Sequence, residues 1–105
     1  MKVMKFGGTS VGKPERMHQV AQLITKGDEP TIVVLSALSG TTNSLVEIST
    51  SLSQGDRMAA KQKIDQLEAH YRAFVLDLLK KEDTRHKAND VLKEHFEYAS
   101  LGRYN

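Results

Sequence analysis

The chain has 105 residues and a mass of 11.7 kDa, and its 15 Lys and Arg against 13 Asp and Glu give a formal net charge of +2. Hydrophobic residues make up 39% and charged residues 27%, which is the balance of a soluble globular chain. A chain of this length buries ~60–70% of its unfolded surface, enough for one modest core. It has no cysteine, which excludes disulfide scaffolds, thiol catalysis and cysteine-based zinc sites.

Charge and hydropathy also argue against two classes of partner. A net charge of +2, without a basic patch interleaved with aromatic residues, does not favour nucleic acid. The longest apolar runs, residues 32–35 and 73–76, are far too short to cross a membrane. Residues 1–5 are too polar for a signal peptide. We therefore expect a cytoplasmic protein that binds neither nucleic acid nor membranes.

The first 36 residues predict a strand, a helix and a second strand. Residues 2–6 suit a short strand partly buried on both faces, and residues 31–36 form the β-branched apolar run of a buried parallel strand. Residues 7–12 between them predict a flexible, glycine-rich loop. Pro14 then suits the first position of a helix that Gly27 ends. The apolar face of this helix is expected to consist of Met17, Val20, Ala21 and Ile24.

The rest of the chain predicts three helices. A polar loop rich in Ser and Thr runs into the first helix, residues 54–56 break it, and Asp83 or Thr84 is expected to cap the last one. The expected buried faces are Leu45, Val46, Ile48 and Leu52 in the first, Ile64, Leu67, Tyr71, Phe74 and Leu78 in the second, and Val91, Leu92, His95, Phe96 and Ala99 in the third.

Two strands are too few for a parallel sheet, which is normally wider and covered on both faces. We therefore expect residues 1–105 to be a single partial domain of a larger α/β fold. It would consist of a βαβ unit over residues 1–46, carrying the loops that bind ligands, and a helical segment over residues 47–105.

The loop after the first strand is the first candidate for chemistry. Gly7 to Lys13 satisfies the spacing G-x-x-x-x-G-K of a phosphate-binding P-loop, but Pro14 stands where that motif has a hydroxyl for magnesium. Glycines at a strand-to-helix turn let backbone N–H groups approach a phosphate closely. From the pattern alone, a phosphate cradle and a plain turn remain equally open.

The wider string Lys5-Phe6-Gly7-Gly8-Thr9-Ser10-Val11 resembles the N-terminal signature of aspartate kinases, including those fused to homoserine dehydrogenase. Residues 34–43, Val-Leu-Ser-Ala-Leu-Ser-Gly-Thr-Thr-Asn, resemble that family's next block. The resemblance runs from about residue 2 to 46, and residues 47–105 are compatible with the family's variable helical insertion. It implies the N-terminal portion of an amino-acid-kinase-type three-layer α/β fold.

The resemblance further implies transfer of phosphate from ATP to the aspartate β-carboxylate, giving aspartyl phosphate, the first step toward lysine, threonine and methionine. The carboxylate of aspartate is already ionised at neutral pH, because its pKa is about 3.9, so no general base is needed. Catalysis is then mostly positioning and charge stabilisation. Both loops leave the C-terminal ends of adjacent parallel strands, where open α/β sheets bind ligands.

Residue by residue, the resemblance makes Lys5 the catalytic cation that neutralises the transferring phosphoryl group. It assigns aspartate binding to Thr42, with Ser39 and Asn43 as weaker candidates on the same loop. The residues expected to bind ATP are Lys5, Phe6, Gly7, Gly8 and Ser10.

The implied partners are aspartate, ATP, Mg²⁺ with its ligands outside this chain, and the remainder of a kinase domain. A homo-oligomer is expected for a different reason, because the two-strand sheet leaves open edges and an apolar face from Ile32 to Leu35. The family's later blocks, which complete the aspartate site and the nucleotide pocket, do not occur in residues 1–105. The chain alone is therefore expected to be inactive.

Two other readings stay open. One is another phosphotransferase, either of the amino-acid-kinase fold with a different acid as substrate or a degenerate P-loop protein. The other is a non-catalytic module whose residues 47–105 form a helical interaction surface. The four histidines, which have no metal-ligand spacing, are expected to be surface or packing residues: His18, His70, His86 and His95.

Overall fold

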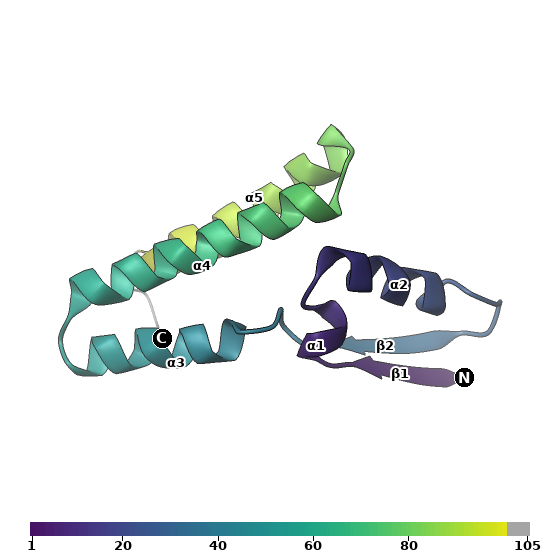
Figure 1. Ribbon diagram of the computed structural model, residues 1–105, viewed down its shortest axis with the longest axis horizontal. Coiled ribbons are helices and arrows are strands. Elements are labelled where there is room, and N and C mark those ends of the chain that lie inside the picture. Colours follow the sequence, from purple (N-terminus) through teal and green to yellow (C-terminus); the bar gives the residue numbers. More distant parts are fainter. Residues whose placement is uncertain (101–105) are drawn as a thin grey trace. The chain divides into compact units, whose positions relative to one another are not determined.

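The computed structural model describes residues 1–100, which fall into two compact units (Figure 1). The first unit spans Met1–Thr42 and the second begins at Asn43. Within residues 1–100 no helix is both long enough and apolar enough to span a membrane. That all of these residues belong to one partial domain stays a prediction.

The first unit is a parallel β-strand pair with two helices between the strands. Strand β1 (Lys2–Phe6) is followed by α1 (Gly8–Val11), α2 (Pro14–Ile24) and β2 (Thr31–Leu35). The strands pair in register from Lys2 opposite Thr31 to Phe6 opposite Leu35. The predicted α/β class and both strands are confirmed, and α2 begins at Pro14 as expected.

A short helix replaces the flexible loop predicted between β1 and α2. The N–H groups of Ser10 and Val11 donate to the carbonyl of Gly7 at 3.0 and 3.3 Å, which closes one turn of helix α1. The side chain of Val11, only 1% exposed, anchors this turn. The sequence pattern missed α1 because its small polar residues resemble a loop, and a single buried valine stabilises the helical turn.

One face of the strand pair is open, which contradicts the prediction of strands buried on both faces. Residues paired across a parallel sheet share a face, so Val3, Lys5, Ile32 and Val34 lie together. Val3 is 66% exposed and Ile32 50% exposed. The physical reason is that α2 lies over the other face of the pair (Figure 1).

Three consecutive helices follow β2, α3 (Thr41–Ser53), α4 (Arg57–Leu78) and α5 (Glu82–Ser100), and the second unit begins after the first two residues of α3. The apolar stripe predicted for α4 is confirmed, because its members are buried or half-buried. Rings of Tyr71 and Phe96 meet edge to face between α4 and α5, with centroids 6.1 Å apart. The core consists of Ile48, Ala60, Ile64 and Leu67, with Leu52, Tyr71, Phe96 and Ala99 packed against it.

The buried faces of α3 and α5 differ from those predicted. In α3, Leu45 and Val46 are 54% and 58% exposed, while the small side chain of Ser51 is buried in their place. The inward face of α3 follows Ile48 and Ser51, which lie three residues apart on one side of the helix. In α5, Val91 and His95 are likewise exposed, and Leu92, Phe96 and Ala99 face inward.

Helix α5 also begins at Glu82, so neither Asp83 nor Thr84 is its cap. The hydroxyl of Thr84 instead donates to the carbonyl of Lys81 at 2.9 Å, within the first turn. The same carbonyl also accepts the N–H of Arg85 at 3.1 Å, so the hydroxyl of Thr84 is a second donor to it.

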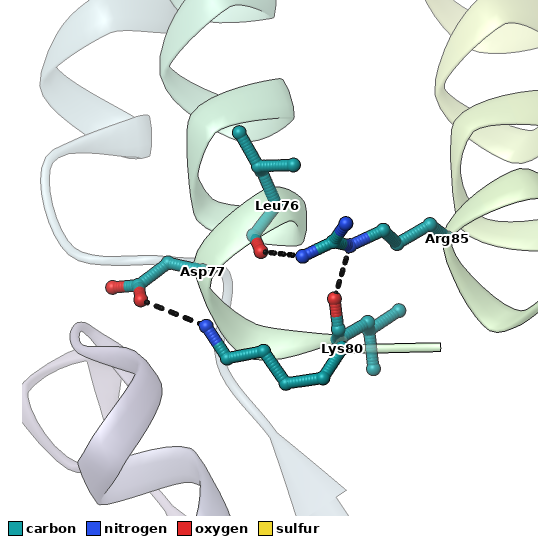
Figure 2. Close-up of polar contacts among 5 residues, drawn as sticks. Leu76, Asp77, Lys80 and Arg85 are labelled. Atoms are coloured by element: carbon teal, nitrogen blue, oxygen red, sulfur yellow. Dashed lines mark hydrogen bonds and ion pairs between the residues drawn. The ribbon is translucent and has the colours of Figure 1, made fainter. Parts of the chain in front are cut away.

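Side chains cap both ends of α4. At its start, Asp56 Oδ1 accepts a hydrogen bond from the N–H of Ala59 at 3.0 Å, which is the usual role of an N-cap carboxylate. At its end, the Arg85 guanidinium of α5 donates to the carbonyl oxygens of Leu76, at 2.8 Å, and Leu79 (Figure 2). The last carbonyls of a helix have no partner within it, so Arg85 supplies one from the next helix.

Candidate functional site

Lys5 lies near the end of β1 on the open face of the strand pair. It is paired in register with Val34 of β2 and is exposed. Within residues 1–100 its ammonium group forms no ion pair. It also forms no hydrogen bond with Thr42, the residue expected to bind aspartate. Within the described residues no carboxylate pairs with Lys5, so its ammonium group is open to an anionic ligand.

The backbone turns directly after Lys5 into α1. Phe6 is half-buried, and its carbonyl accepts the N–H of Ser36 at 3.0 Å, which extends the pairing one step beyond the strands. Gly7 is the N-cap of α1 in an extended conformation, and nothing lies within 4 Å of where its Cβ would be. The N–H groups of Gly8 and Thr9 have no backbone acceptor within the described residues. These two donors are therefore available to an anion.

The loop after β2 lies directly against α1. An added Cβ at Gly8 would come within 3.6 Å of the Ala37 carbonyl oxygen and 3.7 Å of Ser39 Cα. One at Gly12 would lie 2.9 Å from Ser39 Cβ, so a side chain there would force the two segments apart. The structure thus brings together Gly8 and Ser39, which come from the two segments singled out in the sequence.

The remaining candidates lie where this loop becomes α3. Gly40, with a φ of +86°, makes the turn into the helix at a conformation that other residues rarely adopt. Thr41, the first helical residue, is buried, whereas Thr42 is exposed. Asn43 is exposed and belongs to the second unit. Of these two threonines, Thr42 is therefore the one that a ligand could reach.

The P-loop alternative loses support. A P-loop wraps phosphates with a glycine-rich backbone that leads directly into one helix. Here residues 8–11 are themselves helical, and α2 starts separately at Pro14. Lys13 is the exposed N-cap residue between the two helices. In the described part of the chain, no group of three His, Asp or Glu side chains could hold a metal ion.

One residue near the glycines was missed by the sequence analysis. Arg16, in the first turn of α2, donates from Nη1 to the carbonyl of Thr9 at 3.0 Å. Its side chain lines a cavity of about 310 Å³ together with Phe6, Thr9, Ser10, Gln19, Val20 and Leu23. The sequence signal that could have identified Arg16 is its position, because an arginine in the first turn of a helix can reach back to the preceding backbone carbonyls.

The first unit is mixed α/β, and the segments that follow its two strands meet at one end of the pair. The family model for the amino acid kinase family matches residues 1–102, and the chain belongs to that family.

Within the family, the chain is similar to aspartate kinases, which confirms the resemblance found in the sequence. It is 46% identical to "Aspartate kinase" of Pseudomonas fluorescens over 67 residues, covering 60% of this chain and 16% of the relative. It is 60% identical to "Aspartokinase 3, chloroplastic" of Arabidopsis thaliana over 45 residues, covering 42% of this chain and 8% of the relative. "Aspartokinase" of Helicobacter pylori is 38% identical over 68 residues, covering 62% and 16%. The chain matches about a sixth or less of the length of these relatives.

Proposed function

We propose that this chain supplies the phosphate-binding turn and the aspartate-binding loop of an aspartate kinase, which transfers the γ-phosphoryl group of ATP to the aspartate β-carboxylate. The observation that carries the proposal is the approach of Gly8 to Ala37 and Ser39, because it brings the two loops to one end of the strand pair. Similarity to aspartate kinases supports the choice of aspartate over another acid.

Each proposed role follows from a chemical need of the reaction. An anionic carboxylate must attack an anionic phosphate, so charge must be neutralised at the transferring group. Lys5, whose charge is not paired with a carboxylate, is the proposed source of that neutralisation. The N–H groups near Gly7 and Gly8 and the hydroxyl of Ser10 would hold phosphate oxygens, and Phe6 would shape the site beneath them.

On the substrate side, Thr42 is proposed to bind aspartate through its exposed hydroxyl. Ser39, at the contact between the loops, and Asn43, one residue further along α3, are proposed as secondary contacts. The proposal includes a Mg²⁺ ion that accompanies ATP, and it assigns no ligand for that ion to residues 1–100. It also includes the remainder of the kinase domain, a homo-oligomeric assembly and a cytoplasmic location.

The test is a chimera in which residues 1–46 replace the aligned segment of the Pseudomonas fluorescens aspartate kinase. Release of ADP is measured with aspartate and, separately, with other amino acids that carry a side-chain or terminal carboxylate. We expect aspartate-dependent turnover that is lost when Lys5 is changed to Met. Turnover with a different acid would favour another member of the amino acid kinase family, and a folded chimera without turnover would contradict the proposal.

A further inference from the structure

Helix α1 is too short to be stable by itself. Forming a first helical turn is unfavourable, and α1 has only four residues. Its one deeply buried side chain is Val11, at its C-terminal end. The backbone of residues 8–10 therefore needs another contact to hold its position.

Arg16 provides that contact from α2. Its Nη1 donates at 3.0 Å to the carbonyl of Thr9, which lies between Gly8 and Ser10. Helix α2 is fixed by the buried Val20, so the position of Arg16 is set by a packed element. Within residues 1–100, Arg16 makes no ion pair that would draw its guanidinium elsewhere.

We propose that Arg16 is a positioning residue, which orders the turn from Gly7 to Ser10 so that its donors are aligned for the phosphates of the nucleotide. The effect on catalysis rests on the proposed function. The ordering of the turn by Arg16 does not depend on that function. Because the bond is exposed, its loss should disorder the turn without unfolding the unit. Misplacement of a phosphate-binding turn by about 1 Å can cost ~10²-fold in rate.

The first test measures order in the full chain by NMR. Arg16→Gln removes the bond, and Lys26→Gln is the matched control, since it removes one exposed positive charge from the same unit. We expect the Cα shifts of Thr9 and Ser10 to move from helical to random-coil values in Arg16→Gln only, with those of Val33 in β2 unchanged. Unchanged shifts at Thr9 and Ser10 would overturn the proposal, and so would loss of native shifts throughout the unit.

The second test measures kinetics in the chimera that carries residues 1–46. Arg16→Gln should lower kcat/KM for ATP by ~10- to 100-fold and change KM for aspartate less than about twofold, within the scatter for independent sites. Arg16→Lys separates positioning from direct contact with phosphate. Full activity of Arg16→Lys while the turn is disordered would show that only the charge matters, and would overturn the positioning role. An inactive parent chimera would count against the proposed function, and the NMR result would still decide the role of Arg16.

Discussion

Arg85 links the end of α4 to α5, and its loss should destabilise the helical unit. We predict that Arg85→Gln lowers the free energy of unfolding by about 1–2 kcal/mol. A hydrogen bond to a charged group contributes ~1.5–3 kcal/mol when it is well buried. Arg85 makes two, but the bond to Leu76 is exposed and the bond to Leu79 only partly buried, so we expect their total to lie around the lower end of that range.

The unfolding of the second unit can be followed separately from that of the first. The chain has three tyrosines and no tryptophan, and all of the tyrosines lie after residue 43. Tyrosine fluorescence during urea and thermal unfolding therefore reports on the second unit and not on the first. For a domain of 60 to 100 residues, each kcal/mol shifts Tm by about 4–8 °C, so Arg85→Gln should lower it by roughly 4–16 °C.

Two further variants separate the geometry of the guanidinium from its charge. Lys87→Gln removes one positive charge from the same helix at an exposed position, and should change stability by less than about 0.5 kcal/mol. Arg85→Lys keeps the charge near the C-terminus of α4 but cannot span two carbonyls in a fixed fork, so we expect partial recovery. If Arg85→Gln is no less stable than Lys87→Gln, the contact does not stabilise the hairpin and the reasoning fails.

Three predictions concern the site and the open strand pair. In the chimeric kinase, Lys5→Met should lower kcat at least ~10²-fold, the scale for loss of one preorganised transition-state contact, and near-normal turnover would refute its role. Thr42→Val keeps the shape of the side chain and removes its hydroxyl, so KM for aspartate should rise several-fold with KM for ATP nearly unchanged; equal effects on both would indicate a structural residue. The chain itself should self-associate at micromolar concentration through the open face of the strands, and light scattering should show less association for Ile32→Lys; a monomeric parent chain would contradict this.

The strands and the long helices could be predicted because their signals are local. The β-branched run before Ser36 and the apolar spacing from Ile64 to Leu78 each specify one element without reference to the rest of the chain. Helix α1 could not be predicted in this way, since it depends on the burial of Val11 against neighbouring elements. The exposure of Leu45 and Val91 could not be predicted either. Apolar spacing shows which faces of a helix could be buried, but it does not show which face a neighbouring helix covers.

The candidate site also has parts that could be predicted from local sequence and parts that could not. The glycine string identified the turn, and the Ser39 loop was expected at the matching strand end. The contact distances between Gly8, Gly12 and Ser39 depend on tertiary structure, and so does the bond from Arg16 to Thr9. A sequence pattern of glycines cannot distinguish an extended cradle from a helical turn, because glycine permits both.

The parallel pairing of β1 with β2 has a consequence for the order in which the molecule folds. Each pair in the register joins residues 29 positions apart, whereas α4 and α5 are consecutive helices joined by a short connection. Closing a loop costs entropy before the contact is made, so local helical contacts form faster than distant strand pairs. We expect stopped-flow tyrosine fluorescence to report native helical packing before amide protection appears at Met4 and Val33. Strand β1, which precedes the helices of the second unit in the chain, would thus reach its final structure after them.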